Sequence, residues 1–287
     1  MTIRTILVPV RGDGKGDGVL DHAVALGRPF AAHLDIVHCR ARPEDLMPYG
    51  SLMLPGLRET IVESAAAAAQ EEEDKLHELF DTYCREHDLA NVDHPPGPDG
   101  KLSVSWREET GKMSSVVAVR GRLADLIAVA QPDRENQIGH NTLEAALLET
   151  GKMVLMCPPL PATTIGTSVA VAWNGSAEAA RAVTSALSLL TQAKSVTVLS
   201  AAAGSPAGLG PDALIEHLGW HGINATAREL DAKGTEVGQT LLATARDADA
   251  DVLLMGGYGH SRRRELIMGG VTQHIIEAAE MPVILVH

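Results

Sequence analysis

The chain has few aromatic residues, three cysteines and no long apolar run. Aromatic residues make up 3% of the 287 residues, whereas 45% are hydrophobic. Its cores must therefore consist mainly of Val, Leu, Ile, Ala and Met. Cys39, Cys84 and Cys157 form no Cys-x-x-Cys pair, which is typical of reduced intracellular thiols rather than of a disulfide framework. No stretch reaches the roughly 18 apolar residues of a membrane-spanning helix.

Basic residues are also scarce. The 24 Lys and Arg residues stand against 37 Asp and Glu residues, so the formal net charge is −13. Such a charge repels phosphate backbones and anionic lipid surfaces. We therefore expect neither nucleic acid nor a membrane as partner. Residues 1–4 lead directly into an apolar strand without the apolar core of a secretory signal, so the expected location is cytoplasmic.

The order of apolar segments repeats within the chain. Each half has an apolar strand entering a polar turn, then a second apolar strand, then a helical pattern followed by a buried strand. The matched pairs are residues 6–13 with 169–176, 123–129 with 249–255, and 142–156 with 272–285. Three matches in one order indicate duplication. Prolines 158, 159 and 161 mark the break, which predicts two domains, roughly 1–158 and 165–287.

Continuous apolar strands that alternate with helical patterns are typical of parallel sheets covered on both faces. The predicted fold class is therefore α/β, with two doubly wound five-stranded parallel-sheet domains. In the first half, strands are expected near 4–10, 33–39, 102–108, 124–130 and 152–157. In the second half, they are expected near 167–173, 195–201, 223–230, 251–257 and 282–287.

The first half carries an additional stretch. Apolar residues from Leu57 to Leu89 recur mostly at helical intervals, which predicts one long helix. The acidic run Glu71-Glu72-Glu73-Asp74 is expected to be the solvated face of that helix. The preceding segment, Pro43 to Pro55, is rich in Met, Leu and Pro, and either a lid or an interface loop would fit it.

A pair of glycine clusters lies between an apolar strand and an amphipathic helix. Met255-Gly256-Gly257-Tyr258-Gly259 is followed, after nine residues, by Gly269-Gly270-Val271. Gly256 and Gly259 would let a ligand approach the main chain closely. The second cluster would open the next helix, whose free N–H groups and positive dipole end attract anions. The spacing Gly-x-x-Gly-x9-Gly therefore predicts a phosphate site.

This segment, with Asp251 to Met255 before it and Met281 to Val286 after it, resembles the C-terminal half of a universal stress protein domain. The resemblance implies an adenine nucleotide alpha hydrolase-like fold with strand order 3-2-1-4-5. It also implies ATP or a related adenine nucleotide as ligand, with Mg²⁺ as an accompanying ion. ATP-binding members carry Ser or Thr after the last glycine. Gly270 stands there in this chain and supplies an N–H group but no hydroxyl.

The resemblance also implies the binding residues. The adenine side would consist of residues at the ends of the first two strands of the second half, and the phosphate side of the glycine clusters. Asn174 stands where ATP-binding members have Asp, so it can donate and accept hydrogen bonds without a charge. Ser261, or one of Arg262 to Arg264, could replace the missing hydroxyl; alternatively, the arginines form a solvated turn. The full predicted set is Ala172, Asn174, Ala201, Met255, Gly256, Gly259, Ser261, Gly269, Gly270 and Val271.

The first half lacks the glycine motif. Its fourth strand is followed by residues 130–135, Ala-Gln-Pro-Asp-Arg-Glu, and only Gly139 appears later in the loop. Side chains and a proline stand where main chain would meet phosphate. We therefore expect a degenerate, non-binding N-terminal half. The glycine-rich stretch 12–18 matches neither a P-loop nor an EF-hand and is expected to be a flexible turn.

Two hypotheses of function remain. The first is a nucleotide-sensing or nucleotide-storing protein of the stress response with an unknown protein partner. The second is an interaction module that has lost nucleotide binding and acts through its surfaces. No nucleophile elbow Gly-x-Ser-x-Gly is present, so no catalytic residues are predicted and at most slow ATP hydrolysis is expected. No metal site is expected either, and His38 beside Cys39 is expected to be structural.

The duplication also predicts an assembly. The family resemblance implies that single-domain relatives dimerise through their last strands. Residues 153–156 would then face 283–286 within this one chain and hide two sheet edges. The chain would form an intramolecular pseudo-dimer, and further association into a homodimer is left open.

Overall fold

A computed structural model describes most of the chain. The described residues are 2–10, 16–40, 55–95, 97, 100–136, 138–201, 209–231, 237–257 and 270–287. Several predicted features lie outside them, namely most of the first glycine-rich turn, the segment before Pro55, and the stretch from Tyr258 to Gly269 with Gly259, Ser261 and the three arginines.

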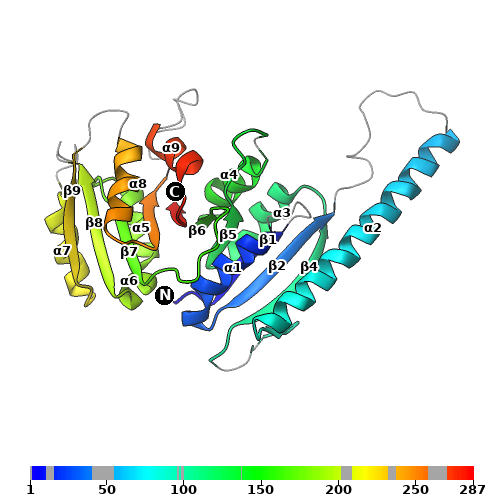
Figure 1. Ribbon diagram of the computed structural model, residues 1–287, viewed down its shortest axis with the longest axis horizontal. Helices are drawn as coiled ribbons and strands as arrows, with labels where there is room; N and C mark the ends of the chain where they lie inside the picture. The colour runs from blue at the N-terminus through cyan, green and yellow to red at the C-terminus, as the bar shows by residue number, and fades with distance from the viewer. Residues whose placement is uncertain are drawn as a thin grey trace.

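The described strands form one sheet across both halves (Figure 1), in the order β3-β4-β2-β1-β5-β6-β11-β10-β7-β8-β9. The first half contributes β1 (Thr5–Val10), β2 (His33–Arg40), β3 (Ala90–Asn91), β4 (Ser103–Thr110), β5 (Leu126–Ala130) and β6 (Met153–Cys157). The second contributes β7 (Ser168–Ala172), β8 (Ser195–Ala201), β9 (Ala225–Leu230), β10 (Val252–Gly256) and β11 (Val283–Val286).

Each half has the strand order that the family resemblance implied. Apart from β3, the third, second, first, fourth and fifth strands of a half are neighbours in that order. All neighbours within a half pair in parallel. The prediction of a doubly wound α/β fold is thus confirmed. The two-residue strand β3, paired with β4, was not predicted because two residues are too few to show a period.

Helices cover both faces of the sheet. On one face, apolar residues of α1 (Gly16–Gly27), α2 (Pro55–Glu86), α5 (Ala177–Ser185), α6 (Leu187–Gln192) and α7 (Pro211–Trp220) pack on the strands. On the other face lie α3 (Met113–Arg120), α4 (His140–Glu149), α8 (Val237–Asp247) and α9 (Gly270–Ala278). Short 3-10 turns, η1 (Arg28–Phe30) and η3 (Gly121–Leu123), follow α1 and α3.

The predicted long helix exists as α2, which runs alongside β4 and projects beyond the sheet in Figure 1. Phe80 and Cys84 anchor it to the core, and burial raises the pKa of the Cys84 thiol to about 11. The expectation of a fully solvated acidic run was wrong for one residue. Glu73 is buried and ion-paired with Arg40 of β2, whereas Glu71 and Asp74 are exposed.

Two aspartates make the same contact in the two halves. Asp125, just before β5, accepts hydrogen bonds from two main-chain N–H groups at the start of β1, at 2.8 and 3.0 Å. Asp251, just before β10, accepts three from the segment entering β7, at 2.8, 2.9 and 3.2 Å. Each carboxylate therefore ties the fourth strand of its half to the first.

The two halves are joined by an antiparallel pair. Val283, Ile284 and Leu285 of β11 lie opposite Met156, Leu155 and Val154 of β6, in that order. All six side chains are completely buried. The last strands therefore face one another as predicted, and neither presents a free edge to solvent.

We expect the two aspartates to differ in their response to Asp→Asn. Both oxygens of Asp251 accept N–H groups, so an amide would place an NH2 group against a donor. The N–H groups at Asp125 all bind Oδ2, which an amide oxygen can replace. Asp251→Asn should lower the free energy of unfolding by about 2–3 kcal/mol and Asp125→Asn by about 1 kcal/mol, as measured by urea unfolding.

Asp249→Asn is the matched control for this comparison. Asp249 is exposed and has a φ of 50°, a left-handed conformation that Asn adopts readily. It should leave stability nearly unchanged. Equal losses for the Asp125 and Asp251 variants would contradict the assigned role of the second oxygen.

Candidate functional site

The best candidate site lies where the strand order of the second half reverses. The first strand of this half, β7, has β8 on one side and β10 on the other. The helix after β7, α5, packs on one face of the sheet, and the helix after β10, α9, packs on the other. In sheets of this kind, ligands bind beyond the carboxyl ends of the strands at such a switch point. The structure brings Ala172, Ala201, Met255 and Gly256 to this one edge. Four of the residues predicted from the sequence thus meet there.

The N-terminus of α9 lies at the same edge. Gly270 is the first residue of α9 and Val271 the second. Thr272 Cγ2 is 3.9 Å from the position that a Cβ on Gly257 would occupy. The first turn of the helix therefore packs beside the end of β10. Among the described residues, apart from its chain neighbours and the backbone of its own helix, no heavy atom lies within 4 Å of the Cβ position of Gly270.

Gly256 has a packing role that the sequence did not reveal. A Cβ at this position would lie 2.6 Å from Ala179 N and 2.6 Å from the Glu178 carbonyl carbon. Both atoms belong to the main chain of the first turn of α5. Glycine is therefore needed here so that α5 can rest directly on β10. The side of Gly256 that a side chain would occupy is filled by the helix.

Gly257 continues β10 toward the site. Its N–H donates to the Val286 carbonyl at 2.8 Å, and its own carbonyl oxygen lies 3.2 Å from His287 Nδ1. A Cβ here would come within 3.4 Å of Leu147 Cδ2 on α4 of the first half. The main chain that enters the glycine motif is therefore held firmly against β11 and lies close to the other half.

The loop after β7 is ordered by its own polar groups. Asn174 is exposed, and its Oδ1 accepts the N–H of Ser176 at 3.0 Å. Ser176 Oγ in turn accepts the N–H of Ala179 at 3.2 Å and caps α5. Trp173 is buried, with its indole N–H donating to the Leu209 carbonyl at 3.0 Å. Asn174 therefore lies at the predicted edge, with its amide oxygen turned into its own loop.

The matching loop of the first half is closed by internal hydrogen bonds. Gln131 N donates to the Cys157 carbonyl at 2.8 Å, and Asp133 N donates to the Ile138 carbonyl at 2.9 Å. Asp133 Oδ1 accepts the N–H groups of Glu135 and Asn136 at 2.9 and 3.2 Å. These four amides already have acceptors within the protein. A carboxylate also stands in the loop, where it would repel an anion.

Side chains of this first-half loop also cap α9. Gln131 Nε2 donates to the carbonyls of Ile276 and Ala279, at 2.8 and 3.1 Å, and Arg134 Nε donates to the Glu277 carbonyl. Carbonyls in the last turn of a helix lack partners within the helix. The first half thus satisfies the C-terminal end of the helix whose N-terminal end borders the candidate site. The sequence contained a signal for this contact, because the loop after β5 carries the long side-chain donors Gln131 and Arg134 where the second half has glycines.

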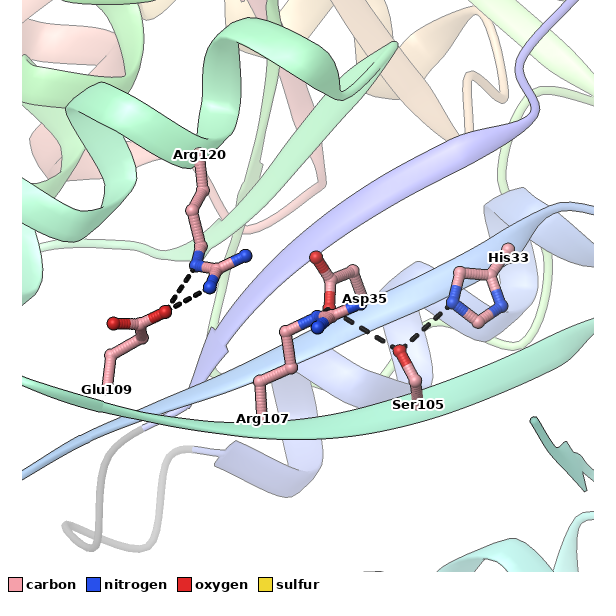
Figure 2. Close-up of polar contacts among 6 residues, drawn as sticks. All are labelled: His33, Asp35, Ser105, Arg107, Glu109 and Arg120. Carbon is pink, nitrogen blue, oxygen red and sulfur yellow. Dashed lines mark hydrogen bonds and ion pairs between the residues drawn. The ribbon is translucent and has the colours of Figure 1, made fainter. Parts of the chain in front are cut away.

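A second polar cluster lies on β2 and β4 (Figure 2). The two ring nitrogens of His33 lie 3.0 Å from Ser103 Oγ and 3.0 Å from Ser105 Oγ. Figure 2 draws the contact with Ser105. Ser105 donates to Asp35 at 3.4 Å, and Arg107 Nε donates to the same carboxylate at 2.8 Å. The serine therefore stands between the histidine and the aspartate. This order differs from a catalytic triad, in which the histidine stands in the middle.

The cluster instead holds the strands together. Since Ser105 gives its one proton to Asp35, Nε2 of His33 must donate to Ser105, and Nδ1 must accept from Ser103. Both serines are 2% exposed. Further along β4, Glu109 pairs separately with Arg120 at the end of α3 and ties the strand to that helix (Figure 2).

His38 is buried, and its ring stacks on Trp106 with centroids 6.0 Å apart, as a structural role requires. Within the described part of the chain, no three or more His, Cys, Asp or Glu side chains are grouped to hold a metal ion. None of the described helices is both long enough and apolar enough to span a bilayer.

Gly256→Ala should destabilise the protein strongly. The added methyl group would press on main-chain atoms of α5 that cannot move without shifting the helix, which we expect to cost about 3 kcal/mol. Gly219→Ala is the matched control, because its Cβ position near the end of α7 is open and alanine favours a helix by about 0.5–1 kcal/mol. Urea unfolding measures both. A neutral Gly256→Ala would contradict the close packing described above.

His33 should make stability fall in acid. Burial lowers the pKa of His33, and this effect exceeds the opposing attraction of Asp35. The fold thus favours the neutral ring. Its contribution is complete above the ordinary histidine pKa of about 6.5 and is lost as the pH falls below that value, because the unfolded chain binds the proton more readily.

Comparison with His33→Gln isolates this contribution. Between pH 7 and pH 5, the variant should lose less stability than the original protein, as measured by urea unfolding at each pH. Exposed His94→Gln should retain the original pH dependence. The same pH dependence in all three proteins would contradict a neutral His33 in the fold.

Solved structures with the same fold span nearly the whole chain. A universal stress protein from Archaeoglobus fulgidus DSM 4304 matches with a TM-score of 0.69 and 13% identity, covering 99% of this chain and 96% of its own. A functionally unknown protein from Pseudomonas aeruginosa PAO1 matches with a TM-score of 0.56 and 15% identity, covering 99% of this chain and 92% of its own. These likenesses establish the fold of both halves.

The family comparison concerns the second half. No curated protein sequence matches the chain. The model of the Universal stress protein family matches residues 167–287. This region begins just before β7 and includes β10 and α9. Residues 167–287 are therefore similar to a domain of the Universal stress protein family.

Proposed function

We propose that the second half binds ATP or a related adenine nucleotide at the carboxyl ends of β7 and β10, with Mg²⁺ accompanying the phosphates. The protein would act as a nucleotide-dependent regulator or sensor in the stress response. The family match to residues 167–287 supports this class of function. The adenine would lie near Ala172 and Ala201, and the phosphates near the start of α9.

The contrast between two matched loops carries the proposal. After β5, the amides of Asp133, Glu135 and Asn136 are bonded within the loop, and the Asp133 carboxylate occupies it. After β10, Gly257 stands where the first half has Gln131, and no other described side chain crowds the Cβ position of Gly270 at the start of α9. An anion requires unbonded N–H groups and room for close approach. The described end of the second loop offers room for an anion, whereas the amides named for the first loop are already bonded.

The position of α9 supplies a route by which a nucleotide would act. Phosphates at its N-terminus would stabilise the first turn through the helix dipole. Its C-terminal end is bonded to Gln131 and Arg134 of the first half. Ligand binding would therefore change the stability of a helix that both halves hold, and a protein partner could recognise that change.

The alternative is an interaction module without a nucleotide. Two observations favour it. Asn174 lacks the charge of aspartate and uses its amide oxygen within its own loop, and Gly256 is explained by helix packing without any ligand. Slow ATP hydrolysis would be an extension of the first proposal, and release of inorganic phosphate from ATP would measure it.

Substitutions at Gly270 separate the two functions. The site has room for a side chain, and an aspartate in the first turn of α9 interacts favourably with the helix dipole, so the fold should persist. Its charge would repel phosphates, and we expect Gly270→Asp to weaken ATP binding at least about 10-fold. Gly270→Ser supplies a hydroxyl and should tighten binding by about 3- to 10-fold, since one hydrogen bond contributes about 1 kcal/mol.

Isothermal titration calorimetry with ATP, ADP and AMP provides the measurement. Gly219→Asp is the control, because it adds the same charge at an open position near the end of α7. It should leave the affinity unchanged. Equal affinity in all four proteins would place the nucleotide elsewhere. Absence of binding in the original protein, with no nucleotide released from freshly purified material, would favour the interaction module.

A further inference from the structure

Two exposed histidines lie one turn apart at the end of α7. His217 is in the last turn of the helix, and His221 is its C-terminal cap. The spacing His-x3-His places both side chains on one face. The sequence shows this spacing directly, so the expectation that the histidines form no metal site overlooked a signal that was present.

The ring geometry suits chelation. The centroids of the two imidazoles are 5.0 Å apart, and the ring planes are inclined at 68°. Metal–nitrogen bonds are about 2.0–2.1 Å long, and adding a ring radius of about 1.1 Å places a centroid about 3.2 Å from the ion. Two such rings at a ligand angle of about 90–110° have centroids about 4.5–5.2 Å apart. The observed separation falls within this interval.

We propose that His217 and His221 together bind one divalent transition-metal ion of the Cu²⁺, Ni²⁺ and Zn²⁺ class. Neutral imidazole nitrogen suits these ions, whereas Mg²⁺ and Ca²⁺ require oxygen ligands. Since no third protein ligand is grouped with the pair in the described residues, water completes the coordination. The site is therefore open and exchangeable, and Cu²⁺ should bind most tightly.

The C-terminal end of α7 favours a cation, and its main chain is already fixed by hydrogen bonds. Partial negative charge gathers at the C-terminus of a helix, so a positive ion is stabilised there. The last turn is fixed by hydrogen bonds from the N–H groups of His221 and Ile223 to the Leu218 carbonyl, at 2.9 and 3.0 Å. Leu218 is fully buried and anchors this turn to the core. Little main-chain entropy is lost when the two rings close on an ion.

Trp220 provides a local probe. It is 84% exposed and precedes His221 directly, so Cu²⁺ bound by the pair should quench its fluorescence. The experiment uses the full chain without a polyhistidine tag, freed of metal with EDTA and titrated with CuCl2, NiCl2 and ZnCl2. Fluorescence and calorimetry are recorded together. Trp220→Phe should remove most of the quenching and leave the calorimetric affinity unchanged.

Substitutions test whether the two rings act as a pair. His217→Ala and His221→Ala should each lower the Cu²⁺ affinity of the tightest site by about 100-fold, because a chelate becomes a single contact. The double variant His217→Ala with Glu216→His keeps the number of histidines but moves one ring off the shared face. It should show the same loss, whereas exposed His94→Ala should show none.

Circular dichroism establishes whether each variant is folded, so that a loss of Cu²⁺ affinity cannot be attributed to misfolding. Unchanged Cu²⁺ affinity in both single alanine variants would overturn the proposal, as would full affinity in the double variant with the shifted histidine. Acidification to pH 5 should release the metal, since a proton and a metal ion compete for the same imidazole nitrogen.

Discussion

The antiparallel contact between β6 and β11 is the constraint on which the arrangement of the molecule depends. Its six facing side chains are fully buried, and it makes one sheet of two halves that each run in parallel. Because the strands meet antiparallel, the carboxyl ends of the two halves lie at opposite edges of the sheet. This joint also brings the first-half loop against the end of α9, where Gln131 and Arg134 bind helix carbonyls.

Within this shared frame, the matched loops have taken different roles. The anchoring contacts are retained, since Asp125 and Asp251 tie the first and fourth strands in the same manner. The segments after β5 and β10 differ in chemistry. In the segment after β5, amides donate to acceptors within the protein, and side chains donate to carbonyls of α9. The segment after β10 enters a glycine motif that leads to the start of α9. In the proposed function, the first half would support α9 and the second half would bind the ligand.

Much of the fold could be predicted from the sequence because buried parallel strands are continuous apolar runs. Contacts between residues that lie far apart in the sequence were harder to predict. Glu73 was taken for a solvated residue because its partner, Arg40, lies on a strand far away in the sequence. The contact of α5 with Gly256 could not be predicted, because the sequence does not show which helix rests on which strand. At the site, Ala172, Ala201, Met255 and Gly256 do meet at one edge, whereas Gly259, Ser261 and Gly269 lie outside the described residues.

Hydrogen exchange measured by mass spectrometry, with and without ATP, tests the central claim most directly. If phosphates bind the open main chain at the start of α9, amides between residues 256 and 273 gain protection, while the already bonded amides of residues 131–143 do not change. Protection of the first-half loop, or no change in either segment at saturating ATP, would contradict the proposal that only the second half binds the nucleotide.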